Sequence, residues 1–549
     1  MKITFSHSGG DNHRPLIRSK VSMGRLDEGG SRGECAGLFS LLDDIATTVT
    51  QAFGPVLRLA EAMFDVGPKM EVDLVTAGVW VPIATALLAD AGIKMAIFSP
   101  GIASILQSNY VALDTFLAEL SQRLLRETSA EDMSAKSNNH TAESLFFRPS
   151  MTEATIQRAQ SRIYAHPKTA EFSKRWNLPI YYQLRFGECC NRLNNAVDHT
   201  RKGGWVAEVF TGTEDRAEWI KSKAGFELPL FLELYDMLLG LWRPDVILRP
   251  LAHRFLRGAV QLVGRTLGFI RDGLEGKLMF GVEIGEDGAA QENGSNGDAP
   301  KPMLPYRTRT PYCWGESEQD VAAVAWELAI LETEIVHDYV TTVSEALQGR
   351  VESTESNRKE LHEAAAEVLK EASEQIRPLI DTSWNDVIVK ILTAKCSAPL
   401  AAVKGVAATY RMTNRPPPTQ ASPFVATILR PVKEFDKDFT NRTPEHVGNK
   451  WKYLIVSTVA DRYAAAVEEL IATVQRTEVA LQNRRARRAA SGGVSDGDKV
   501  KLQLYLDFKA FSRNVEEVGV DISSIAGIAQ LQTLTGEAEQ LLQPNQNGK

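Results

Sequence analysis

The chain has 549 residues, of which 44% are hydrophobic and 24% are charged, and its formal net charge at pH 7 is -7. This length predicts about three or four folding units, and the composition excludes a fully disordered chain. The negative balance gives no overall attraction to nucleic acid or anionic lipid, so either partner would need a local basic patch.

The first residues of the chain, 1–35, are polar and rich in glycine, and we predict that they are disordered. They contain no apolar core of a secretory signal, so we expect a soluble protein of the cytosol. A helical segment is predicted over 36–128. Its most apolar stretch, Leu74–Ala89, is shorter than the about 20 residues that span a bilayer, and Pro82 interrupts it. We therefore interpret this stretch as a buried pair of helices and expect any membrane contact to be peripheral.

The middle of the chain alternates between helical and polar segments. Within it, Trp242-Arg243-Pro244 and Arg249-Pro250 bracket a short break between helices. Further on, apolar residues spaced three or four apart run from Val321 to Leu347 and predict one long helix. We predict a linker over 129–149, a helical bundle over 150–280, a flexible insertion over 281–318 and a second bundle over 319–395.

The last part of the chain, 396–535, is predicted to be a C-terminal helical domain, followed by a disordered tail over 536–549. Its lead-in holds three successive prolines, Pro416–Pro418, which exclude a helix interior and favour an extended backbone. We expect this rigid arm to make the domain a docking site for a partner.

Two long amphipathic helices are predicted inside this domain. Their apolar residues recur every three or four positions, from Ile455 to Leu481 and from Leu504 to Val518. The segment between them, Asn483–Asp498, is predicted to be a linker, with Asp496 or Asp498 capping the second helix.

Helical spacing of this kind recurs along the chain, and no convincing alternation typical of strands accompanies it. Amphipathic helices bury their apolar sides against one another in bundles. We therefore predict an all-α protein, in which bundles follow one another to form an elongated rod.

Motifs of catalysis are missing from the sequence. There is no phosphate-binding loop, no dinucleotide fingerprint, no serine elbow and no His-Glu-x-x-His zinc motif. The five cysteines show no metal-type spacing, and we interpret His166 as a helix-boundary or core residue. We predict no catalytic residue, no cofactor and no metal; a helical enzyme using the adjacent Cys189 and Cys190 stays as a rival hypothesis. The tryptophans Trp80, Trp176 and Trp242 are interpreted as packing residues.

A basic run, Arg484–Arg488, follows the helix that begins near Ile455. It is typical of a solvated linker, and it is also compatible with contact to anionic lipid or with a nuclear signal. A helical nucleic-acid-associated protein using this run is therefore the alternative function.

One stretch is more specific than generic helix. Residues 174–186 read KRWNLPIYYQLRF, and His166-Pro167 and Phe172 precede them. In this stretch Asn177 and Pro179 are expected to end one helix and begin the next, with Trp176 fixing the corner. The stretch resembles the middle of the second subunit of the conserved oligomeric Golgi (COG) complex.

Further stretches agree with that resemblance in order along the chain, which the match covers over about 36 to 535. Family members are expected to begin with a long helical region that engages sister subunits, whereas this chain opens with the glycine-rich Met1–Gly33 and follows the pattern from near Gly37. The matching stretches are Trp80-Val81-Pro82, Phe98-Ser99-Pro100-Gly101, Asn109-Tyr110, Tyr410–Arg415 with Pro418-Thr419 and Leu429-Arg430-Pro431, and Asp496–Leu504 with Leu506-Asp507.

The resemblance implies a non-catalytic subunit of a vesicle tether on the cytoplasmic face of the Golgi, with the helical rod fold of multisubunit tethering complexes (CATCHR-like). Its implied role is in intra-Golgi retrograde transport and Golgi organisation. Its implied partners are the other COG complex subunits, vesicle-fusion proteins and small GTPases of the Golgi, and the Golgi membrane as a peripheral contact. Nucleic acid is not an expected partner.

Overall fold

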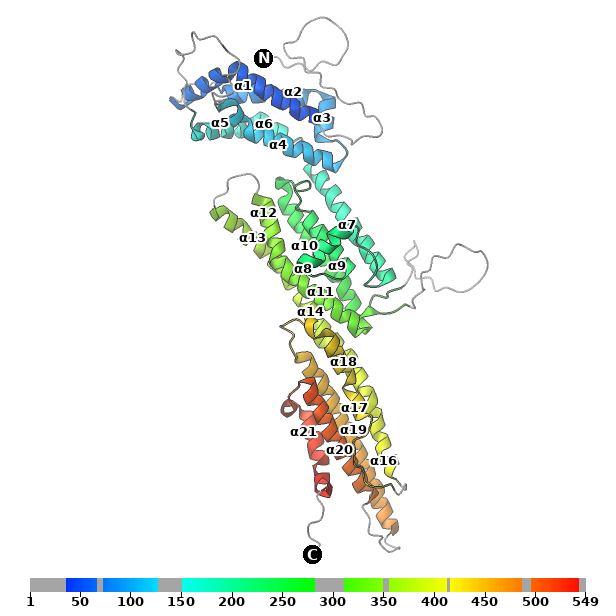
Figure 1. Cartoon of the computed structure of the whole chain (residues 1–549). Coiled ribbons are helices and arrows are strands. Elements are labelled where there is room, and N and C mark those ends of the chain that lie inside the picture. Colours follow the sequence, from blue (N-terminus) through cyan, green and yellow to red (C-terminus); the bar gives the residue numbers. More distant parts are fainter. Residues whose placement is uncertain are drawn as a thin grey trace, which may run out of the picture. The chain divides into compact units, whose positions relative to one another are not determined.

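The computed structural model of the chain is helical throughout its described part, as Figure 1 shows. Within that part the only extended pairing is an isolated antiparallel bridge between Phe280 and Tyr312. The prediction of an all-α fold is therefore confirmed for these residues. The structure describes residues 36–66, 73–126, 151–281, 311–348, 355–411, 415–485 and 495–542.

The chain divides into two compact units. The first unit consists of residues 1–190 and 240–258, and the second of residues 191–239 and 259–549. The division falls inside α7 (Leu178–Gly203) and α10 (Ala252–Leu274), and before the last residue of α9 (Pro229–Gly240).

The first unit is built on two long helices, α1 (Ala36–Val66) and α4 (Ala103–Leu125), which pack side by side. The shorter elements pack around this pair, with α5 against α4 and α6 against α2. These elements are η1 (Leu74–Trp80), α2 (Val81–Ala89), α3 (Ala91–Phe98), α5 (Glu153–Ala165) and α6 (Pro167–Ser173).

The apolar stretch Leu74–Ala89 is a buried pair of helical segments, as predicted. Its first segment η1 is a π-helix that begins at the cap residue Asp73, and Pro82 stands in the first turn of α2. Val75, Trp80 and Leu87 are almost fully buried. No single helix in the described ranges is long and apolar enough to cross a membrane; only Leu74–Ala89 taken together with α3, across a 95° bend, reaches that length and composition.

The second unit is organised around α19 (Lys450–Arg485), which packs against α15, α20 and α21. The short break predicted around Pro244 and Pro250 is confirmed, since α9 ends at Gly240 and α10 begins at Ala252. The remaining helices are α8 (Glu214–Ala224), α9 (Pro229–Gly240), α11 (Glu318–Val336), α12 (Asp338–Gln348), α13 (Glu355–Glu374), α14 (Arg377–Thr382), α15 (Val389–Ser397), α16 (Gly405–Tyr410), α17 (Val425–Ile428), α18 (Arg430–Phe439), α20 (Asp496–Val518) and α21 (Ala526–Thr535).

The single helix predicted from Val321 to Leu347 is in fact two helices. α11 ends at Val336 and α12 begins at Asp338, because His337 leaves the helical conformation with φ -107° and ψ -81°. The apolar stripe crosses the break, since Ile335 and Tyr339 on either side are both buried. A one-residue break shifts the 3.6-residue period too little to be visible in the sequence.

The linker predicted for Asn483–Asp498 is shorter than expected. α19 continues to Arg485 and α20 begins at Asp496, while 486–494 lie outside the described residues. The predicted aspartate cap is wrong: Ser495 is the N-cap, and its hydroxyl accepts a hydrogen bond from the N–H of Asp498. Both aspartates stand in the first turn instead, where their charge suits the helix dipole.

Two segments predicted as flexible contain ordered core residues. At the end of the insertion 281–318, Trp314 is fully buried and its ring lies 5.0 Å from that of Trp205. In the tail 536–549, residues 536–542 form the 3-10 helix η9 (Gly536–Leu542), which packs against α20. Residues 282–310 of the first segment and 543–549 of the second lie outside the described part.

The linker predicted over 129–149 also lies outside the described residues. The helices after it, α5 and α6, pack against elements of 36–128 and belong to the first unit. The finer division of the chain into bundles at the predicted boundaries stays a prediction.

Candidate functional site

The residues singled out for chemistry have structural roles or lie on helix surfaces. His166 is the N-cap of α6, and its Nδ1 accepts a hydrogen bond from the N–H of Lys168 at 3.0 Å, so its interpretation as a helix-boundary residue is confirmed. Cys189 and Cys190 are both half-buried. Among the described residues, no group of three or more His, Cys, Asp or Glu side chains is placed to hold a metal ion.

The basic run Arg484–Arg488 is divided by the end of a helix. Arg484 and Arg485 belong to α19, and Arg487 and Arg488 lie outside the described residues. The nucleic-acid alternative that rests on this run stays a prediction.

The corner predicted at Trp176 is confirmed. α6 ends at Ser173, α7 begins at Leu178, and Trp176 is buried between them. Its ring lies edge-on to Phe98 with the centroids 4.7 Å apart, and to Tyr110 at 5.1 Å. The residues of the family-like stretch therefore join the start of α7 to α3 and α4 within the first unit.

An apolar groove lies beside this corner. It encloses about 170 Å³ and is lined by uncharged side chains, among them Phe98, Ile102, Leu106, Ile180 and Leu184. Ile102, Ile180 and Leu184 are each about half exposed. The described helices thus leave this groove open to solvent.

An exposed apolar surface occupies the C-terminal half of α1. Phe53, Val56, Leu59 and Met63 are 48%, 53%, 45% and 42% exposed, and their spacing places them on one side of the helix. We call these four residues the α1 stripe. Four large apolar side chains exposed together on one helix are unusual in an isolated soluble protein and are typical of a contact surface.

The stripe begins where α4 ends. The hydroxyl of Thr50 donates to the carbonyl oxygen of Arg123, two residues before the end of α4, at 3.2 Å. Upstream of that point Leu42, Ile45 and Val49 are buried. The apolar side of α1 is therefore covered along its N-terminal half and open along the next turns.

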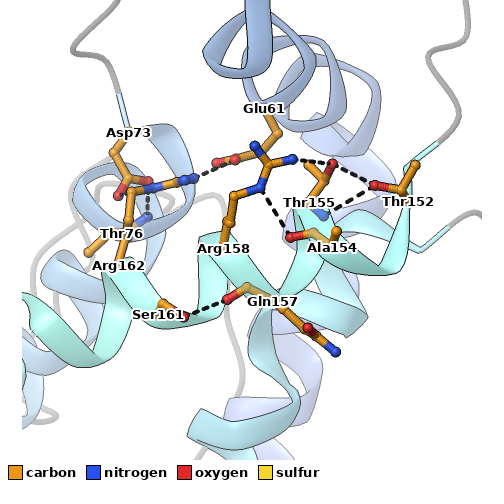
Figure 2. A network of polar contacts seen from close by, with 10 residues as sticks. All are labelled: Glu61, Asp73, Thr76, Thr152, Ala154, Thr155, Gln157, Arg158, Ser161 and Arg162. Carbon is orange, nitrogen blue, oxygen red and sulfur yellow. Dashed lines mark hydrogen bonds and ion pairs between the residues drawn. The ribbon is translucent and has the colours of Figure 1, made fainter. Parts of the chain in front are cut away.

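A buried polar network fixes the opposite side of α1 at this point, and Figure 2 shows it. Glu61 is 1% exposed and forms an ion pair with Arg162 of α5. Arg162 also pairs with Asp73 at 3.2 Å, and Asp73 caps η1 by accepting from the N–H of Thr76 at 2.8 Å. Three elements, α1, η1 and α5, are thus held together through one guanidinium group.

Hydrogen bonds in the first turns of α5 stabilise the part of the helix that carries the arginines of this network. Thr152 caps the helix by accepting from the N–H of Thr155 at 3.2 Å, and the side chain of Arg158 donates to the carbonyl oxygen of Ala154 at 3.2 Å. Figure 2 shows Arg158 and Arg162 on the side of α5 that faces Glu61. Because the network holds one side of α1 in place, the stripe faces outward at a fixed orientation.

The second unit buries a carboxylate in a different way. Glu327 of α11 is 1% exposed, and its Oε1 accepts from the N–H groups of Glu227 and Leu228 at 2.7 and 3.0 Å. These donors lie at the start of α9, so Glu327 caps that helix from a neighbouring one. Burial raises the pKa of Glu327 from 4.5 to about 7, although the two backbone hydrogen bonds oppose the shift.

Neither the α1 stripe nor these buried carboxylates were predicted from the sequence. The stripe could have been suspected from the composition of Gln51–Met63, because Arg58 and Glu61 are the only charged residues in that segment. No local sequence pattern marks Glu327, because its partners are about 100 residues away.

Comparison with known proteins agrees with the resemblance seen in the sequence. The family described as "COG complex component, COG2, C-terminal" matches residues 174–508. The protein named "Conserved oligomeric Golgi complex subunit 2" of Arabidopsis thaliana is 26% identical over 454 residues, which cover 80% of this chain and 50% of that protein. The protein of the same name in Homo sapiens is 22% identical over 417 residues, which cover 72% of this chain and 52% of that protein. No solved structure matches the chain significantly.

The chain spans about half the length of the curated relatives it matches. The family match nevertheless covers more than half of the chain itself. The chain therefore belongs to the family of COG complex component COG2, C-terminal.

Proposed function

We propose that the chain is a non-catalytic subunit of the conserved oligomeric Golgi complex, acting in vesicle tethering and intra-Golgi retrograde transport. The observation that carries this proposal is the family match over residues 174–508. In this role the protein works on the cytoplasmic face of the Golgi as a peripheral component, with the other COG subunits as its direct partners. Vesicle-fusion proteins and small GTPases of the Golgi are the further partners proposed.

Long helices suit such a role physically. Tethering needs reach and several simultaneous grips, and it requires no bond chemistry. A helix gains about 1.5 Å per residue, so the 36 residues of α19 span about 54 Å. Several weak contacts held along such helices add up through effective concentration.

The α1 stripe supports assembly with a sister subunit. The apolar side of α1 that α4 covers continues, uncovered, into Phe53–Met63. The stripe residues are uncharged, so the surface that fits them is the apolar side of another helix. We propose that an amphipathic helix of a sister subunit occupies it and extends the seam between α1 and α4.

Depletion of the protein in its native cells tests the tethering role. We expect glycosylation enzymes of the Golgi to become mislocalised, and re-expression of the chain to restore their distribution. The double variant Phe53→Ser/Leu59→Ser is expected to restore it poorly. The matched control is Val368→Ser on α13, where a large apolar side chain is exposed to a similar extent, 42%. An unchanged distribution of these enzymes after depletion would contradict the proposed transport role.

A further inference from the structure

An exposed run of prolines lies in the C-terminal part of the second unit. Arg415, Pro416 and Pro417 are exposed, Pro418 is half-buried, and residues 415–419 belong to no helix or strand. The proline ring fixes φ near -65°, and a residue that precedes a proline is driven to extended or polyproline II backbone. Because Arg415, Pro416 and Pro417 each precede a proline, the run is held close to a polyproline II helix by its covalent structure.

Two side chains of α20 hold the chain on both sides of the run. Upstream, the hydroxyl of Tyr410 donates to Oε1 of Gln503 at 2.7 Å. Downstream, Nε2 of Gln503 donates to the carbonyl oxygen of Gln420 at 2.9 Å. Asp507 accepts from the N–H and the hydroxyl of Ser422 at 2.6 and 2.8 Å.

These anchors are buried, unlike the prolines between them. Asp507 is fully buried and Gln503 is 7% exposed. The two also bond each other, since Nε2 of Gln503 donates to Oδ1 of Asp507 at 2.9 Å. Buried hydrogen bonds of this kind are costly to break, so Tyr410, Gln420 and Ser422 are fixed to α20 while Arg415–Pro417 face solvent.

We propose that Arg415–Pro418 is a docking motif for a partner domain with an aromatic-lined, proline-binding groove. Such grooves recognise the polyproline II conformation itself, and the rings of Pro416 and Pro417 are the exposed apolar groups that pack between aromatic side chains. The guanidinium of Arg415 beside them pairs with a carboxylate at the edge of the groove.

Anchoring at both ends makes the motif a stronger ligand than the same residues in a free peptide. A flexible ligand loses conformational freedom on binding, and that loss is smaller when the bound conformation already exists. Gln503 and Asp507 are therefore positioning residues for the motif, and they contact no partner themselves.

The test is a binding titration of the full chain against purified proline-recognition domains as probes, one each of the SH3, WW and EVH1 classes. Each probe has a control in which an aromatic residue of its groove is replaced by alanine. We expect saturable binding to at least one probe, lost when the groove aromatic is removed. The variant Pro416→Ala/Pro417→Ala should bind that probe at least tenfold more weakly. Pro423→Ala, an exposed proline outside the run, is the matched control and should bind like the unchanged chain.

A synthetic peptide of residues 411–421 is the second arm and should bind the same probe severalfold more weakly than the chain does. The proposal is overturned if no probe binds at concentrations up to on the order of 1 mM, or if the double proline variant binds as tightly as the unchanged chain. Equal affinity of peptide and chain would overturn the positioning role of Gln503 and Asp507. Thermal unfolding of the double variant should match that of the unchanged chain, because the prolines it replaces are exposed.

Discussion

The two long helices α1 and α19 use the same apolar spacing with different results. On α19, Ile455, Val459 and Tyr463 are fully buried, because α15, α20 and α21 all pack against this helix. On α1, Leu42, Ile45 and Val49 are buried, but the stripe from Phe53 to Met63 is about half exposed. Helical spacing therefore determines which side of a helix is apolar, and the neighbouring elements determine whether that side is covered.

Two buried carboxylates, one in each unit, are stabilised differently. In the first unit, the carboxylate of Glu61 meets a guanidinium, Arg162, in an ion pair. In the second unit, the carboxylate of Glu327 meets backbone N–H groups at a helix start. An ion pair is disrupted by removing either partner, whereas a backbone-capped carboxylate with a raised pKa responds to pH.

Replacing a phenylalanine by alanine in the covered part of the second unit and in the α1 stripe should give the largest difference in the free energy of unfolding. Phe511 of α20 is fully buried, and its ring lies 5.3 Å from that of Tyr463 of α19. Phe511→Ala is expected to lower the free energy of unfolding by about 3–5 kcal/mol, through lost burial and the cavity that it leaves. Phe53→Ala in the α1 stripe should change it by less than about 0.5 kcal/mol. Urea unfolding of both variants measures the difference, and equal losses would refute the exposed position of the stripe.

Removal of the buried charge in the first unit should have the next largest effect. Glu61→Ala leaves Arg162 with Asp73 as its remaining carboxylate partner in the network of Figure 2, and is expected to cost about 3 kcal/mol. The double variant Glu61→Ala/Arg162→Met should be less destabilised than the sum of the two single variants, because it removes both charges of the Glu61–Arg162 pair together. Additive losses in a double-mutant cycle would show that the pair is not coupled.

The pH dependence of the second unit should give a smaller effect. The folded-state pKa of Glu327, about 7, lies above the ordinary 4.5, so folding favours its protonated form. Its contribution to stability is complete below pH 4.5 and is lost as pH rises through about 7, at most about 3 kcal/mol in total. Glu327→Gln should remove this part of the pH dependence of unfolding, which falls between pH 4.5 and about 7. The control Glu363→Gln, on the exposed surface of α13, should keep it; a wild-type slope in the Glu327 variant would disprove the raised pKa.

A double substitution in the α1 stripe should have the smallest effect on stability and a large effect on binding of a sister subunit. Phe53→Ser/Leu59→Ser should leave thermal unfolding almost unchanged, since both side chains are about half exposed already. We expect the same variant to reduce the amount of sister subunit recovered with the chain, while Val368→Ser does not. Full recovery with the double variant would place the subunit contact elsewhere.

Much of the fold could be predicted from the sequence, because helix content follows from apolar spacing. The helix through Ile455–Val474 and the corner at Trp176 were both predictable from short patterns. The break at His337 was not, since one residue outside the helical conformation leaves the period intact. Ser495 competes with two neighbouring aspartates for the role of cap, and the sequence alone does not decide between them.

The candidate surfaces were harder to predict than the fold. A single buried tryptophan, Trp314, is hidden at the edge of a polar, glycine-rich segment. The exposure of the α1 stripe depends on where α4 ends along α1, which is a long-range contact between Thr50 and Arg123. The proline run was visible in the sequence, but its anchoring by Gln503 and Asp507 was not, because those residues lie about 85 positions further along the chain.

Affinity purification of the tagged chain from its native cells, followed by mass spectrometry and size determination, tests the central claim most directly. Membership of a tethering complex predicts recovery in a large assembly that contains the other COG complex subunits. Recovery at the size of the single chain, without any of those subunits, would contradict it.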